Sequence, residues 1–180
     1  MCSSDLDAAV QALNVGQQLT DSFTVTTEDG TQQVVSIVTD GTNDAAQISG
    51  TTSGAVVEAG GVNNALTETP VATGQLGGTD VDNTSPVVFT VVSTPAAANY
   101  GTYTIDASGA WSYTLNNADA AVQALNVGQQ LTDSFTVTTE DGTQQVVSIV
   151  MDGTNDAAQI SGTTSGAVVE AGGGDNALTE

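Results

Sequence analysis

The chain of 180 residues contains 21 Asp and Glu but no Lys, Arg or His, so its formal net charge is −21. Without cationic side chains it cannot neutralise phosphates, which argues against nucleic acids as partners, and no apolar run reaches the roughly 18 residues of a membrane span, so we expect no membrane insertion. A nucleophile would also lack an ordinary base, because there is no His or Lys and the single cysteine is Cys2, so we expect no enzymatic activity.

A long internal repeat organises the chain. Residues 7–68 return as residues 119–180, at an offset of 112 positions. The aligned pairs that differ are Thr39 and Met151, Val62 and Gly174, and Asn63 and Asp175. A period of 112 residues is too long for a solenoid unit and matches a self-sufficient domain, so each repeat should have its own core.

Turn-rich segments, each reading Asp-Gly-Thr-Asn-Asp, mark the predicted domain boundaries at residues 40–44 and 152–156. Residues 1–6 have no counterpart at residues 113–118, and we interpret them as a non-native head that includes Cys2, so no disulfide framework is expected. The predicted parts after this head are the C-terminal part of a truncated repeat, a complete repeat and the start of a third, at residues 7–44, 45–156 and 157–180.

Runs rich in Val, Thr, Ile, Tyr and Phe, separated by Gly, Asn, Asp, Ser and Pro, predict short strands joined by turns. In chain order, the strands of the complete repeat are expected at residues 46–51, 54–58, 71–78, 86–93, 99–105, 110–115, 132–139 and 143–151. Alternation along these runs predicts an inward face made of Val87, Phe89, Val91, Tyr103, Ile105, Trp111, Tyr113, Leu115, Phe135, Val137, Val147 and Ile149.

The connections complete the expected fold. Residues 106–109 and 140–142 predict hairpin turns, with Gly109 and Gly142 accepting a positive φ. Asp119, followed by apolar residues three apart, predicts a single helical turn that crosses between two sheets. Short strands without intervening long helices predict an all-β fold: a tandem immunoglobulin-like or cadherin-like β-sandwich whose neighbouring strands are antiparallel.

Calcium is the ligand that this composition favours, because Ca²⁺ takes about six to eight oxygen ligands from carboxylates, amides and carbonyls. Acidic clusters occur at both boundaries, at an Asp-x-Asp pair and at a glutamate that is repeated. The candidate metal ligands are Asp40, Asn43, Asp44, Glu58, Asp80, Asp82, Asp152, Asn155, Asp156 and Glu170. Plainer interpretations stay open: the acidic residues give solubility or adaptation to salt, and the Asp-Gly and Asn-Asp steps simply build turns.

Several motifs occur together in a fixed order: residues 77–83, residues 100–115, residues 121–137 and the Asp-Gly-Thr-Asn-Asp-Ala sequence at each boundary. In this combination the chain resembles the bacterial VCBS repeat, which occurs in tandem in giant biofilm-associated and RTX-type adhesins. The resemblance implies a β-sandwich that is exported by type I secretion and serves outside the cell or on its surface. The order of the acidic residues is also similar to that of cadherins, which implies that Asp80 and Asp82 face the preceding linker and Glu58 the following one.

We therefore expect a structural extender of a large adhesin, with neighbouring repeats of the same chain as its direct partners and Ca²⁺ stiffening the junctions. Such an extender would support cell adhesion and biofilm formation by presenting a distal domain, whose ligand the sequence does not identify. The alternative is that each repeat itself binds a carbohydrate or a protein surface. That alternative requires solvent-facing aromatic side chains or a concave polar patch.

Overall fold

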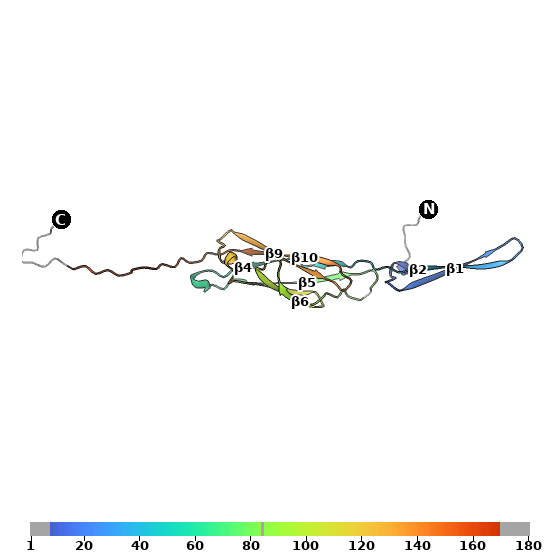
Figure 1. Ribbon diagram of the computed structural model, residues 1–180, viewed down its shortest axis with the longest axis horizontal. Coiled ribbons are helices and arrows are strands. Elements are labelled where there is room, and N and C mark those ends of the chain that lie inside the picture. Colours follow the sequence, from blue (N-terminus) through green and yellow to red (C-terminus); the bar gives the residue numbers. More distant parts are fainter. Residues whose placement is uncertain (1–7, 84, 170–180) are drawn as a thin grey trace, which may run out of the picture.

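The computed structural model describes residues 8–83 and 85–169, and the structural statements below refer to these residues. A β-sandwich occupies the middle of an elongated molecule (Figure 1). A hairpin projects from one end of the sandwich, and residues 160–169 run out as an extended chain at the other end (Figure 1). The chain thus enters and leaves the sandwich at opposite ends. The proposed head, residues 1–6, lies outside the described residues.

The sandwich consists of a larger and a smaller sheet. The larger sheet has the spatial order β3 (Gln47–Gly50), β5 (Val71–Thr79), β8 (Ala110–Leu115), β7 (Gly101–Ile105) and β6 (Val92–Pro95), and its neighbours are antiparallel. The smaller sheet has the order β4 (Ser53–Val57), β10 (Gln144–Asp152) and β9 (Gln130–Thr138). The prediction of an all-β sandwich is confirmed.

The pairing of β4 differs from the expected antiparallel arrangement. Strand β4 runs parallel to β10, with Ser53 opposite Ser148 and Val57 opposite Asp152. The reason is that β4 follows β3 almost directly, so the chain changes sheets without reversing. Gly50 stands at this crossing with a φ of 111°, and a Cβ there would lie 2.4 Å from the carbonyl oxygen of Gln75.

The predicted helical turn is confirmed as α2 (Ala120–Gln123), which connects β8 of the larger sheet to β9 of the smaller one. Asp119 caps it, because its carboxylate accepts hydrogen bonds from the backbone N–H groups of Ala121 and Val122. The other short helices are α1 (Ala8–Gln11) and the 3₁₀ turn η1 (Val62–Asn64). In the described part of the chain, no helix is long and apolar enough to cross a membrane.

The hydrophobic core lies within one repeat and contains most of the predicted inward-facing residues. Its buried members are Val56, Ala72, Leu76, Phe89, Ala96, Tyr103, Ile105, Trp111, Tyr113, Leu115, Val122, Phe135, Val137, Val147, Ile149 and Met151. Aromatic rings form its centre: Phe135 stacks on Tyr103 with ring centroids 4.2 Å apart, and Trp111 meets Phe135 edge-on at 5.6 Å. The repeat therefore has its own core, as its length predicted.

Val91 is the exception, since it is exposed, and Val87 is only partly buried. The strand expected at residues 86–93 is wrong for residues 86–91, which form only an isolated bridge at Phe89, and β6 spans Val92–Pro95. Phe89 N–H donates to the carbonyl of Ala107 beside the larger sheet, and Thr90 N–H donates to Thr138 of β9 in the smaller sheet. Because this segment is bonded to both sheets, alternate side chains after Phe89 no longer point into the core, and Val91 is exposed.

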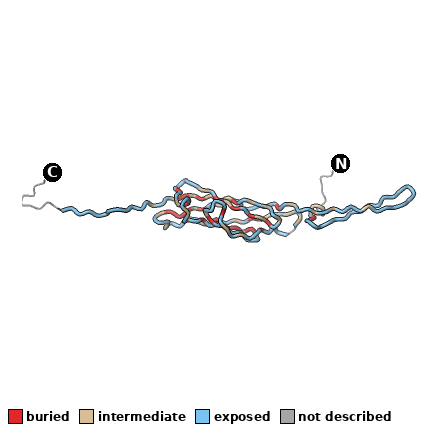
Figure 2. The backbone as a smooth tube through the Cα atoms, in the orientation of Figure 1, coloured by how far each residue is buried: buried red, intermediate tan, exposed pale blue. Residues whose placement is uncertain are grey.

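The N-terminal hairpin repeats the sequence of the β9–β10 hairpin in a different environment. It consists of β1 (Gln18–Thr26) and β2 (Gln32–Asp40), paired antiparallel. Phe23 is 51% exposed while its counterpart Phe135 is 3% exposed. Figure 2 shows the same contrast along the backbone, with the hairpin largely exposed and the buried residues gathered in the sandwich. The difference arises because β9 and β10 are covered by the larger sheet, whereas β1 and β2 project away from it.

Candidate functional site

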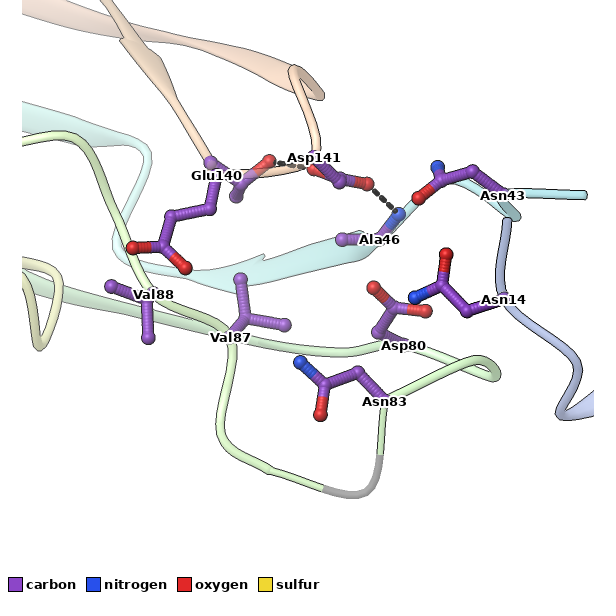
Figure 3. A pocket seen from close by; sticks show the side chains of 10 residues that line it. Asn14, Asn43, Ala46, Asp80, Asn83, Val87, Val88, Glu140 and Asp141 are labelled. Carbon is purple, nitrogen blue, oxygen red and sulfur yellow. Dashed lines mark hydrogen bonds between the residues drawn. The ribbon is translucent and has the colours of Figure 1, made fainter. Parts of the chain in front are cut away.

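Oxygen-bearing side chains gather where the chain enters the sandwich, which we call the N-terminal junction. A cavity of about 210 Å³ there is lined by Asn14, Asn43, Asp80, Asn83 and Asp141 among others. Figure 3 shows these side chains around the cavity: Asn14 comes from the segment before β1, Asn43 from the linker, and Asp80, Asn83 and Asp141 from the sandwich. The cavity thus lies between one repeat and the next.

Asp82 holds the linker that precedes the sandwich. Its Oδ2 accepts a hydrogen bond of 2.5 Å from the backbone N–H of Asp44. Its Oδ1 is buried without a hydrogen-bond partner among the described residues. The Asp-x-Asp pair lies in a turn after β5 rather than on an extended strand, because the N–H of Asp82 donates to Asp80 Oδ1 at 2.9 Å. Asp82 therefore holds the linker through one carboxylate oxygen, while the other is buried without a hydrogen-bond partner among the described residues.

Asp141, in the β9–β10 turn, is a junction residue that the sequence did not single out. Its Oδ2 accepts 2.8 Å hydrogen bonds from the N–H of Ala46 and from the hydroxyl of Thr143, and Thr139 donates to its Oδ1. Burial raises the pKa of this carboxyl, but the hydrogen bonds from Thr139, Ala46 and Thr143 outweigh it and hold the pKa well below its usual range. Asp141 is thus a stably ionised carboxylate beside the linker.

Glu58 occupies the corresponding position where the chain leaves the sandwich, the C-terminal junction. The residue follows β4 and is fully buried. Its Oε1 accepts a 2.9 Å hydrogen bond from Thr154 N–H, while its Oε2 is buried without a partner among the described residues. Burial raises the pKa of Glu58 and repulsion from Asp156 adds to it, although the Thr154 hydrogen bond opposes them. A buried, half-satisfied carboxylate is costly unless it is protonated or a cation completes it.

The other candidate ligands lie along the two linkers. Asp40 and Asp152 end β2 and β10, and each accepts a side-chain hydrogen bond from a glutamine of the neighbouring strand, Gln18 and Gln130 respectively. Asn43 and Asn155 each donate a side-chain hydrogen bond to the backbone carbonyl of the Asp that follows. Glu170 lies outside the described residues.

Acidic side chains gather at both junctions of the sandwich. Among the described residues, no group of three acidic side chains is close enough to hold a metal ion. The N-terminal junction presents Asp80, Asp82 and Asp141, and the C-terminal junction presents Glu58 and Asp156.

The signal for Asp141 was present in the sequence but required the strand directions. Because β4 and β10 are parallel and β3 leads into β4, the turn before β10 lies at the same end of the sandwich as the start of β3. Ala46 and Asp141, 95 residues apart, therefore meet.

No curated protein matches the chain. The family described as "Bacterial cadherin-like domain" matches residues 43–153, which is more than half of the chain and includes β3 to β10. The chain therefore belongs to the bacterial cadherin-like domain family.

Proposed function

We propose that the complete repeat is a rigid extender of a large bacterial surface adhesin of the VCBS type, and that Ca²⁺ stiffens its junctions. The observation that carries the proposal is the placement of carboxylates where the chain enters and leaves, at opposite ends of the sandwich (Figure 1). Domains with this geometry add length when they are joined in series. Membership of a cadherin-like family agrees with a structural or adhesive role rather than a catalytic one.

The chemistry of the junctions favours calcium over a plain solvated surface. Glu58 Oε2 and Asp82 Oδ1 are buried without partners among the described residues, so their charges are not simply hydrated. The chain contains no Lys, Arg or His that could neutralise them. Carboxylate and carbonyl oxygens suit a hard cation such as Ca²⁺. The oxygen donors at each junction therefore suit the chemistry of Ca²⁺, and we propose that the domain before and the domain after each supply ligands.

The aromatic side chains do not favour the alternative, a ligand-binding repeat. Trp111, Tyr113, Phe89 and Phe135 are buried in the core, and Tyr100 is partly buried. The described surface of the sandwich thus presents no fully exposed aromatic ring on which a carbohydrate could stack. An extender requires repetition rather than a distinct site on each domain, and the near-identity of the two copies agrees with it.

The resemblance to VCBS repeats extends the proposal to the whole protein. We propose that the protein is exported by type I secretion and lies outside the cell or on its surface. Its direct partners are neighbouring repeats, and it supports adhesion and biofilm formation by presenting a distal binding domain.

The test uses a protein with two complete repeats joined by the natural linker. A ligand that binds only the native state stabilises it by RT ln(1 + [L]/Kd), so calcium at about 100 times its Kd should add about 2.7 kcal/mol. Calcium should raise the melting temperature and the maximum dimension in small-angle scattering more than sodium of equal ionic strength. If calcium and matched sodium act alike, the calcium proposal fails. If the two-repeat protein is compact both in calcium and in sodium of equal ionic strength, the extender proposal fails.

A matched pair of variants tests whether calcium acts at the junction. Glu58→Gln at the junction should weaken the calcium response, because it removes the buried charge and keeps the size of the side chain. Glu68→Gln should leave the response unchanged, since Glu68 is exposed. Alanine at Asp152, Asn155 and Asp156 of the junction should abolish the selectivity for calcium and shorten the particle, with each domain still folded. Equal responses from the Glu58 and Glu68 variants would contradict the assignment.

A further inference from the structure

The linker leaving the sandwich is bonded to a loop of the domain that it leaves. The N–H of Gly61 donates to the carbonyl of Asn155 at 3.0 Å, and the N–H of Ala157 donates to the carbonyl of Gly61 at 3.1 Å. These bonds form a parallel bridge between Gly61 and Asp156. One edge of the linker is therefore engaged as a short strand. We call residues 59–66 the linker clamp.

The linker clamp is itself fastened to the sandwich. Ala59 N–H donates to Asn117 Oδ1 at 3.1 Å, and Asn64 Nδ2 donates to Gln123 Oε1 at 2.5 Å. Gly60 and Leu66 exchange backbone hydrogen bonds of 3.1 and 3.0 Å, which close the loop. A Cβ on Gly60 would lie only 2.2 Å from Thr154 Oγ1, so the approach of the linker requires glycine at this position.

The linker that precedes the sandwich is hydrogen-bonded to it through backbone groups at repeat positions different from those that the linker clamp uses. Asp82 accepts a hydrogen bond from the N–H of Asp44, and Asp141 accepts one from the N–H of Ala46. By the repeat, Asp44 and Ala46 are the counterparts of Asp156 and Ala158. A domain thus uses two N–H groups of the linker before it, and the clamp uses different groups of the linker after it.

These two sets of groups lie on opposite edges of an extended chain, where the backbone groups of alternate residues point the same way. Asn155 C=O and Ala157 N–H point to one edge, and the N–H groups of Asp156 and Ala158 point to the other. Each of these backbone groups is therefore used by one of the two domains only. We propose that residues 155–158 form a strand shared by two repeats, held by the clamp of the domain before and by the Asp82 and Asp141 equivalents of the domain after.

This interaction surface has the neighbouring repeat as its partner and needs no metal, so it goes beyond the proposed role of calcium. Fixing both edges of the linker removes its rotation and sets the orientation of successive domains. Calcium would add to an orientation that is already defined.

Amide hydrogen exchange of the full chain in a chelator tests the clamp. The Ala157 amide should exchange about tenfold more slowly than the amides of residues 160–169, which run free of the sandwich. Gly60→Ala should remove this protection, because its Cβ would displace Thr154. Gly77→Ala is the matched control, since a Cβ there meets nothing within 4 Å, and should leave it intact. Unprotected Ala157 in the wild type would overturn the proposal.

Spin labels on either side of the junction of a two-repeat protein test the shared strand. In chelator, the wild-type distance distribution should be narrow. Gly60→Ala in the first repeat and Asp141→Ala in the second should each broaden it, because each releases one edge. If the wild-type distribution is as broad as that of the double variant, the shared strand does not form. These results hold whether or not calcium binds, so a failure here is distinguishable from a failure of the calcium proposal.

Discussion

Phenylalanine occurs at the same repeat position in two environments, which allows a controlled test of the core. Phe135 is 3% exposed, stacks on Tyr103 at 4.2 Å with an interplanar angle of 13°, and receives Trp111 edge-on. Replacing a buried Phe by Ala costs about 3 to 5 kcal/mol, and each aromatic pair adds about 0.5 to 1.5 kcal/mol beyond the buried area. We expect Phe135→Ala to lower the free energy of unfolding by about 4 kcal/mol. Phe23→Ala, at the 51% exposed counterpart, should change it by about 0.5 kcal/mol or less.

Urea unfolding followed by tryptophan fluorescence measures the difference. The chain has a single tryptophan, Trp111, inside the sandwich, so the signal reports the complete repeat and not the hairpin. With an m value of about 2 kcal/mol/M, the midpoint should shift by about 2 M for Phe135→Ala and remain nearly constant for Phe23→Ala. Equal shifts for the two variants would refute the reasoning, because they would mean that Phe23 stabilises the sandwich as much as the buried Phe135 does. A shift for Phe135→Ala below about 0.5 M would refute the assigned packing.

Further expectations concern proteolysis, packing and pH. Trypsin should produce no fragments of the untagged chain in mass spectrometry, since it has no Lys or Arg, and any tryptic fragment would contradict the sequence. Trp111→Ala should cost about 3 to 5 kcal/mol by circular dichroism, because it also leaves the carbonyl of Thr51 without its 2.9 Å hydrogen bond; a cost below about 0.5 kcal/mol would place the ring at the surface. The lowered pKa of Asp141 makes its carboxylate stabilising above the unfolded pKa of about 3.9, so the stability difference between wild type and Asp141→Ala should shrink on acidification below about pH 4, and a constant difference would count against it. The raised pKa of Glu58 means that its ionised form destabilises the metal-free protein. In chelator at pH 7, Glu58→Gln should therefore be more stable than the wild type, and this gain should disappear as the pH falls through the pKa of Glu58. A variant that is less stable than the wild type at pH 7 would contradict the burial of an unpaired charge.

Local alternation was sufficient to identify most strands and their buried faces. Phe135 and Val137 on β9, and Val147 and Ile149 on β10, are buried as predicted. Successive side chains of a strand point to opposite faces whatever its partners are, so the buried face of each strand can be predicted from its own short sequence. The helical turn after Asp119 was predictable for the same reason, because its cap is local.

Strand direction and long-range contacts were not predictable in this way. The parallel pairing of β4 depends on a crossing at Gly50, and the exposure of Val91 depends on a segment that bonds to both sheets. Neither is visible in a local pattern. The candidate site shows the same limit: the acidic linkers were found by composition, whereas Asp141 looked like an ordinary turn residue until the fold brought it to Ala46.

The parallel pairing of β4 with β10 bears on how the domain responds to mechanical load. Tension along an array would pull on the chain ahead of β4 and on the C-terminal end of β10, since the chain enters and leaves at opposite ends (Figure 1). Because the strands are parallel, these points lie at opposite ends of the ladder that joins Ser53–Val57 to residues 148–152. Single-molecule pulling should therefore give a high rupture force that falls when β4 is weakened, and an unchanged force would contradict this. Loaded lengthwise, the ladder must shear as a whole instead of unzipping one hydrogen bond at a time.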